Sequence, residues 1–142
     1  ADPLAPVAGG IPDTYVPARN LVLLSLAAAL AEARGAQAVA IGVNALDYSG
    51  YPDCRRAFLQ AFQGTLDVGT REGVEGRGIR VLAPLLDMSK SDILARARAL
   101  GVPVEATLSC YDPGPAGLAC GHCDACRLRA RAEAELAQRP GS

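Results

Sequence analysis

Four cysteines lie close together near the C-terminal end of this chain, in the pattern Cys110-x9-Cys120-x2-Cys123-x2-Cys126. Two tight two-residue spacers and one longer loop can bring four thiolates around a single tetrahedral zinc ion. The longer loop is rich in proline and glycine, which allow it to fold back on itself. The pattern therefore predicts one zinc ion per chain, which ties this loop to the start of the helix that follows.

Two other uses of clustered cysteines fit the spacing less well. An iron–sulfur run of the ferredoxin type has its fourth cysteine downstream and followed by proline, whereas here the fourth lies upstream and Arg127 follows Cys126. A redox dithiol needs only one C-x-x-C pair and leaves two cysteines unexplained. Because four thiolates already complete a zinc site, we expect His122, which lies in a spacer, to face solvent.

Apolar residues at helical spacing predict three helices upstream of the cysteines, over 17–35, 52–66 and 89–101. In the third of these, Leu94 and Leu100 are expected on the buried face. A final charged helix is expected over 124–138, and its mixed signs indicate a solvated helix rather than a basic binding face.

Short apolar runs predict buried parallel strands over 38–43 and 79–83, with a glycine-rich turn over 69–78 between them. Strand, helix and strand in this order form one crossover of an α/β parallel sheet. Two strands are too few, however, because a parallel sheet is normally covered on both faces and its open edges invite pairing. We therefore expect a completing N-terminal segment or a second copy of the chain, as in a homodimer.

The predicted organisation has two parts. A partial α/β domain is expected over 1–105, with a polar loop over 42–56, and a metal-binding segment over 106–142. The polar loop follows the carboxyl end of a predicted strand, where ligands bind in open α/β sheets. Five of its side chains offer hydrogen bonds or a stacking surface to a planar heterocycle, with Tyr48 as a second ring: Asn44, Asp47, Tyr51, Asp53 and Arg55. The same residues equally fit a solvated loop whose Asp, Ser and Gly make turns.

Two basic residues beside turns, Arg19 and Lys90, are candidates for binding phosphate. Lys90 falls in the first turn of a helix for which Ser89 and Asp92 have capping-box spacing, and free N–H groups there favour an anion. Taken singly, each residue also fits an ordinary surface charge. Cys54 is interpreted as a packed thiol, because an adjacent arginine alone is weak evidence for an activated nucleophile.

Composition argues against several functions. The formal net charge is −1 with both signs spread along the chain, so direct nucleic-acid binding is not expected. No apolar run reaches about 18 residues, the length that a membrane span requires. The first residues do not have the pattern of a signal peptide, and we expect a cytoplasmic protein.

Four segments occur in an order and spacing that resemble one known family: residues 15–20, residues 42–55, the segment ending at Lys90, and residues 109–129 with their four cysteines. The family is that of the 7-cyano-7-deazaguanine synthases, and the resemblance extends from Gly10 to about Ala137. It implies a PP-loop ATP pyrophosphatase fold, which is a Rossmann-like parallel sheet flanked by helices, with a zinc site near the C-terminus.

By this resemblance the chain would serve an ATP- and Mg²⁺-dependent ligase of the queuosine pathway, which converts 7-carboxy-7-deazaguanine and ammonia to a nitrile. The loop over 44–55 would hold the deazaguanine, and Arg19 and Lys90 would hold or neutralise the ATP phosphates. The four cysteines would hold a structural zinc ion, since a closed shell of thiolates has no open position for substrate.

The sequence departs from the family in one respect. The family begins with a strand followed by Ser-Gly-Gly-x-Asp-Ser, whose backbone amides cradle the ATP pyrophosphate, and the present sequence does not contain this segment. We therefore expect the chain to correspond to the C-terminal two-thirds of such an enzyme and to be incomplete as a catalyst. Two other functions remain open, namely a non-catalytic zinc-stabilised binding module and a sulfur-transfer relative acting on tRNA, which would need a reactive cysteine and a more basic surface.

Overall fold

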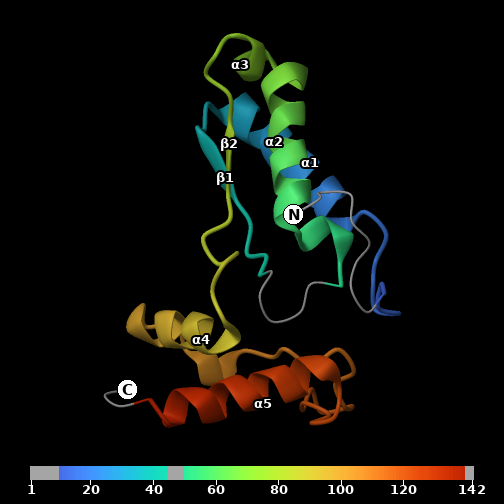
Figure 1. The fold of residues 1–142 in the computed structure, drawn as a ribbon, viewed down its shortest axis with the longest axis vertical. Coiled ribbons are helices and arrows are strands. Elements are labelled where there is room, and N and C mark those ends of the chain that lie inside the picture. Colours follow the sequence, from blue (N-terminus) through green and yellow to red (C-terminus); the bar gives the residue numbers. More distant parts are fainter. Residues whose placement is uncertain (1–9, 45–49, 140–142) are drawn as a thin grey trace. The chain divides into compact units, whose positions relative to one another are not determined.

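The computed structural model describes residues 10–44 and 50–139, which form two compact units, Ala1–Asp87 and Met88–Ser142 (Figure 1). The division predicted from sequence lies between residues 105 and 106. In the structure, helix α4 (Lys90–Ala99) lies upstream of that point and packs against α5 (Asp124–Ala137). The second unit therefore contains this helix as well as the cysteines.

The first unit contains helices α1 (Arg19–Arg34), α2 (Arg56–Gly69) and α3 (Arg71–Val74), the 3₁₀ turn η1 (Pro52–Cys54), and strands β1 (Ala38–Ala40) and β2 (Arg80–Leu82). The strands pair in parallel, with Val39 opposite Val81. The predicted α/β class with its parallel two-stranded sheet is confirmed. Both strands are shorter than the apolar runs that predicted them.

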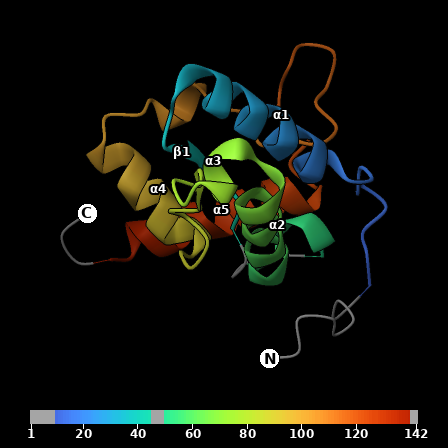
Figure 2. The ribbon, with the colours of Figure 1, turned by 90° about the horizontal axis from the view of Figure 1, so that it is seen from above.

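The core of the first unit lies between the helices and one face of the sheet. Helix α2 buries Leu59, Phe62 and Leu66 at helical spacing, and α1 buries Leu24 and Ala28 beside them. This cluster packs against the central valines of both strands, and both views show α1 and α2 beside the strands (Figures 1 and 2). At the alternate strand positions, Ala38 is half-buried and the other three residues are exposed, so the second face of the sheet is mostly uncovered within the described residues.

The two edges of this sheet differ. On the outer edge of β2, the Gln63 side-chain amide donates to the Ile79 carbonyl (3.0 Å) and accepts from the Val81 N–H (2.8 Å), as a neighbouring strand would. On β1, Gln37 and Ile41 bond to β2, so the peptide groups of residues 38 and 40 point outward. Among the described residues these outward groups have no hydrogen-bond partner. The open edge of the sheet is therefore that of β1.

The second unit consists of α4, the 3₁₀ turn η2 (Val104–Ala106) and α5. Helix α4 begins with the predicted capping box, because the Ser89 hydroxyl accepts from the Asp92 N–H (3.1 Å) and the Asp92 carboxylate accepts from the Ser89 N–H (3.2 Å). Leu94 is buried as predicted. The prediction for Leu100 was wrong, since this residue is the C-cap of the helix and is 66% exposed.

Of the helices that the structure describes, none combines the length and the apolar character needed to cross a membrane.

Candidate metal centre and ligand-binding segment

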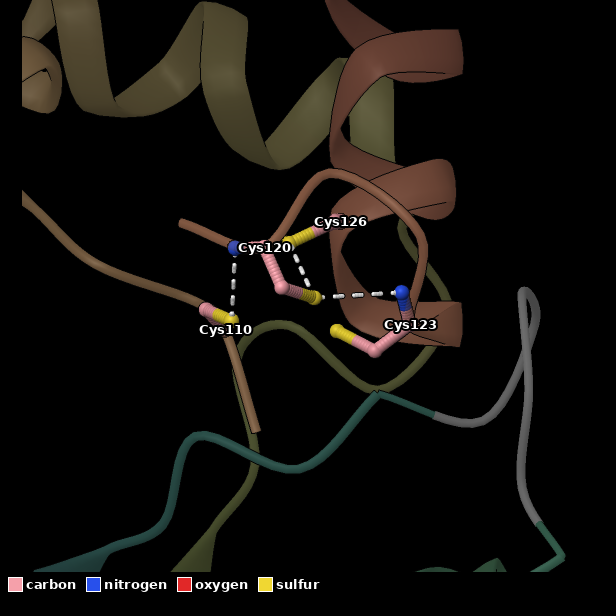
Figure 3. Close-up of side chains that lie close together, drawn as sticks. All are labelled: Cys110, Cys120, Cys123 and Cys126. Atoms are coloured by element: carbon pink, nitrogen blue, oxygen red, sulfur yellow. Dashed lines mark hydrogen bonds between the residues drawn. The ribbon is translucent and has the colours of Figure 1, made fainter. Parts of the chain in front are cut away.

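The four cysteine side chains of the second unit converge on one point (Figure 3). Their sulfur atoms all lie within 4.8 Å of one another, and the Cys120 and Cys126 sulfurs are 4.0 Å apart. Four sulfurs bound at about 2.3 Å to a tetrahedral zinc ion would be about 3.8 Å apart. The arrangement can therefore hold a metal ion, and it includes all four predicted ligands.

Three short segments supply these ligands. Cys110 follows η2, Cys120 and Cys123 flank a turn in which Gly121 has φ +77°, and Cys126 lies in the first turn of α5. The Cys120 N–H donates to the Cys110 sulfur (3.3 Å), and the Cys123 N–H donates to the Cys120 sulfur (3.4 Å). Such bonds orient ligands and stabilise negative charge on sulfur.

The crowding of these thiols shifts their pKa values in opposite directions. Backbone hydrogen bonds from Tyr111 and then Cys126, followed by contacts with other cysteines, lower the pKa of Cys123 to about 6. For Cys126, the Gly121 backbone acts to lower the pKa, but desolvation and the neighbouring cysteines outweigh it and raise the value to about 12. Four thiolates cannot coexist this closely without a positive charge among them, and a dication supplies that charge.

His122 is exposed, as expected, and its Nδ1 atom lies 2.9 Å from the Cys120 carbonyl oxygen. It lies outside the group of four sulfur ligands. The predicted metal site therefore needs no contribution from this residue.

Arg129, which no sequence motif singled out, braces the loop leading to the first cysteine. Its guanidinium donates to the carbonyls of Thr107 (2.6 Å) and Val104 (2.8 Å), and it pairs with Glu133 on the next turn. The Arg129 side chain is only 19% exposed, whereas that of Arg131 is 78% exposed. Because both arginines have a glutamate four residues later, sequence spacing alone does not distinguish the brace from the solvated pair.

In the first unit, the segments over 15–20 and 51–55 lie against each other. The rings of Tyr15 and Tyr51 stack with centroids 6.2 Å apart, and the Thr14 and Tyr51 hydroxyls are 2.6 Å apart. The Asn20 N–H donates to the Asp53 carboxylate (2.9 Å). Two segments singled out separately in the sequence thus form one continuous contact at the N-terminus of α1.

Four predicted site residues lie along this contact: Arg19, Tyr51, Asp53 and Arg55. Arg19 is exposed in the first turn of α1, and Asp53 is buried. Asn44 lies beyond the carboxyl end of β1 and donates to the Leu85 carbonyl beyond β2 (3.3 Å). Lys90 opens α4 in the second unit, and its side chain is half-buried. Asp47 and Tyr48 lie outside the described residues.

Cys54 belongs to the apolar core of the first unit and is 9% exposed. Burial, and then the charge of Asp53, raise the pKa of this thiol above its usual value. The thiol is therefore uncharged at neutral pH, in agreement with its interpretation as a packed side chain rather than a nucleophile.

Comparison with known proteins gives a consistent result. The family described as "Queuosine biosynthesis protein QueC" matches residues 4–137 of the chain. Proteins named 7-cyano-7-deazaguanine synthase are similar over most of it. The one from an Azoarcus species is 59% identical over 121 residues, which are 85% of this chain and 53% of that protein.

The synthase of Anaeromyxobacter dehalogenans is 59% identical over 131 residues, which are 92% of this chain and 56% of that protein. The synthase of Geotalea daltonii is 56% identical over 130 residues, which are 91% of this chain and 57% of that protein. The chain therefore spans a little over half the length of these curated relatives.

Proposed function

The chain belongs to the family of the queuosine biosynthesis protein QueC, and from this premise we propose that it is the substrate-binding and zinc-binding part of a 7-cyano-7-deazaguanine synthase. The observation that carries the proposal is the 59% identity to proteins of that name over most of the chain, together with the family match over residues 4–137, a range that includes the loop over 50–55 and all four cysteines. The product would be 7-cyano-7-deazaguanine, formed for queuosine biosynthesis.

The proposed reaction is an ATP-dependent C–N ligation. A carboxylate is a poor electrophile, so the carboxylate of 7-carboxy-7-deazaguanine must first attack the α-phosphorus of ATP and displace pyrophosphate, which makes one of its oxygens part of an adenylate. Ammonia then displaces AMP and, after loss of a proton, forms the amide. The amide oxygen attacks a second ATP and again displaces pyrophosphate, and the loss of AMP and two protons leaves the nitrile.

We assign the deazaguanine to the polar segment that follows β1. Asn44 lies at the carboxyl ends of the two strands, which is where open α/β sheets bind ligands. Tyr51 offers a ring, and Arg55 offers a planar fork of donors that suits a carboxylate. Asp47 is proposed by resemblance alone. For Asp53, burial and the hydrogen bond to α1 favour a role in shaping the site over direct contact.

We assign Arg19 in the first unit and Lys90 in the second, each taken separately, as candidates for contact with the ATP phosphates. Each stands in the first turn of a helix, where the helix dipole favours an anion. Mg²⁺ would accompany the ATP phosphates. The chain's contribution would be positive charge that compensates the charge developing on the leaving phosphate.

We propose that the metal is zinc and that its role is structural. A four-thiolate shell suits zinc and leaves no coordination position for substrate. When bound, the ion would supply a crosslink between the loop that carries Cys110 and the first turn of α5. The proposed function thus needs the metal for folding of the second unit, not for chemistry on the substrate.

We further propose that a completing segment covers α1 and the β1 edge. Helix α1 is apolar around most of its circumference, which is typical of a buried helix. Its outward face exposes five large apolar side chains: Leu21, Val22, Leu23, Leu26 and Leu30. An apolar patch of this kind on one helix marks an interaction surface.

The occupant that fits is a strand-forming segment from the part of the synthases that this chain does not match. Such a segment can extend the parallel sheet at β1 but not at β2, where Gln63 already occupies the edge. It would also be the source of the glycine-rich ATP loop that the family resemblance implies. A second copy of the chain on the same face would give a homodimer instead, which sedimentation of the chain alone would reveal.

The test is formation of the nitrile by the zinc-loaded chain with 7-carboxy-7-deazaguanine, ammonia, ATP and Mg²⁺, with and without the remaining part of a synthase supplied as a separate polypeptide. We expect product only when both polypeptides are present. Product from neither mixture, together with no measurable binding of 7-carboxy-7-deazaguanine to the pair, would contradict the proposal and favour the second candidate, a zinc-stabilised binding module.

A further inference from the structure

Helix α1 begins without a cap of its own. Its N-cap residue, Ala18, has a left-handed backbone (φ 55°, ψ 20°) and makes no side-chain capping bond. Instead, the backbone N–H of Asn20 in the first turn donates to the carboxylate of Asp53 (2.9 Å), which lies 33 residues further along the chain. A carboxylate is the favoured partner at this end of a helix because it satisfies an orphan donor and complements the helix dipole.

The Asn20 side chain returns the contact. Its amide nitrogen donates to the Asp53 carbonyl (3.1 Å) and to the Cys54 sulfur (3.2 Å). Asn20, Asp53 and Cys54 are only 8%, 5% and 9% exposed. Buried polar groups that satisfy one another in this way hold their segments in one geometry, because water cannot replace a lost partner without exposing the site.

This pair of contacts joins the two parts of the proposed ligand site within the first unit. Arg19 immediately precedes Asn20, and Arg55 immediately follows Cys54. The Tyr15–Tyr51 stack and the hydroxyl contact of Thr14 hold the preceding residues of the same two segments together. The relative position of the two arginines is thus set by the intervening hydrogen bonds, not by the arginine side chains themselves.

Resting on the proposed function, we propose that Asn20 is a positioning residue, which acts through Asp53 and Cys54 to hold the segment over 51–55, where the deazaguanine would bind, in register with Arg19, which would contact the ATP phosphates. Asn20 itself is buried, and its side-chain amide is engaged by Asp53 and Cys54. Its loss should therefore weaken ligand binding by releasing the segment, while every side chain that contacts the ligand is still present. A residue that only stabilised the fold would weaken binding no more than any other core residue does.

The experiment compares Asn20→Ala with Leu66→Ala. Leu66 is buried in the same unit at the far end of α2 and makes no side-chain hydrogen bond, so it is a control for general destabilisation. Hydrogen exchange of the backbone amides is measured in the zinc-loaded chain, at a temperature where thermal unfolding shows all three proteins to be folded. We expect the amides of residues 20 and 53–55 to exchange at least about tenfold faster in Asn20→Ala, the effect of one lost buried hydrogen bond, and to be unchanged in Leu66→Ala.

The second measurement is calorimetric titration with 7-carboxy-7-deazaguanine in the presence of the completing polypeptide. We expect Asn20→Ala to bind about tenfold more weakly or worse, as expected for losing one buried hydrogen bond, and Leu66→Ala to bind within about twofold of wild type. Equal loss of affinity in both variants would overturn the positioning role. If the wild-type protein binds no ligand, the proposed function is wrong. The inference is then tested by hydrogen exchange alone, and unchanged exchange in Asn20→Ala would overturn it.

Discussion

The two units of this protein are stabilised by different means. The first has an extended apolar cluster drawn from two long helices and both strands, but its described residues leave one sheet face mostly uncovered, together with one edge and one side of α1. Among the described residues of the second, the buried apolar cluster consists of Leu94, Val104, Ala132 and Leu136, and further order comes from four cysteines and an arginine brace.

The difference teaches how a chain compensates for a small core. Apolar burial contributes roughly 25 cal/mol per Å² of surface removed from water, so a helix pair with four buried apolar residues gains little from it. Small units of this kind need a disulfide or a metal to fold. The first unit has the opposite need, because its apolar surface exceeds what its own elements can cover.

The largest expected effect comes from removing the metal, which tests whether the second unit depends on it for folding. With Cys126→Ser, we expect zinc content to fall from one per chain to near zero and the helices of the second unit to lose order, because metal binding to such sites supplies on the order of 10 kcal/mol of folding free energy. Metal analysis and helical circular dichroism measure both effects. Cys54→Ser is the matched control and should retain the metal; loss of zinc in that variant would contradict the assignment.

The corresponding change in the first unit removes a side chain from its apolar cluster. Phe62→Ala should cost about 3–5 kcal/mol, the range for truncating a buried phenylalanine, because Phe62 is 4% exposed in the centre of the apolar cluster. Its zinc content should be unchanged. Val68→Ala, on the same helix but 77% exposed, should leave denaturant unfolding almost unaffected. A large effect at Val68 would show that this exposed side chain is covered in solution.

A smaller effect is expected from the arginine brace. Arg129→Ala removes the charged donor that binds the Thr107 and Val104 carbonyls and should cost about 1–3 kcal/mol, seen as a lower midpoint of chelator-induced unfolding. Arg131→Ala removes an exposed pair that contributes about 0.3–0.5 kcal/mol, so its midpoint should hardly move. Equal shifts in the two variants would show that the hydrogen bonds of Arg129 to the loop contribute nothing.

The smallest expected effect is a pH dependence of zinc binding by the second unit. The pKa of Cys126 is about 12, so zinc must displace its proton at every pH below that value. The pKa of Cys123 is about 6, so zinc must displace a proton from this thiol only below about pH 6. The zinc affinity should therefore fall by about an additional factor of ten per pH unit below pH 6. Competition with a chromophoric chelator between pH 5 and 8 measures the slope. A slope that does not change near pH 6 would exclude Cys123 as the thiol that titrates there.

Local patterns predicted much of the fold. The stripe of Leu59, Phe62 and Leu66 marked α2, and Ser89 with Asp92 marked the start of α4, because both signals involve neighbours within one helix turn or two. The helix α3 was missed, since its cap at Thr70 lies in a stretch whose glycines indicated a turn. Leu100 was misplaced because apolar spacing does not reveal where a helix ends.

The site residues also fall into two groups, those that sequence spacing predicted and those that depend on tertiary contacts. The four cysteines were found from spacing, because a metal site built from two C-x-x-C steps and one loop is largely a local object. The contact between Asn20 and Asp53 was not, since a hydrogen bond across 33 residues depends on how α1 and η1 pack. The brace of Arg129 and the sealing of the β2 edge by Gln63 were missed for the same reason.

The sequence by itself determined most of the helices, both strands, the four cysteines that can hold a metal ion and the family, because periodicity and motif spacing act over short distances along the chain. Only the tertiary structure decided that Asp53 caps a helix and that Arg129 supports the metal loop. It also decided that the sheet is open at β1 and closed at β2. These are properties of partners distant in sequence, and the burial that makes their hydrogen bonds matter arises only when the chain has folded.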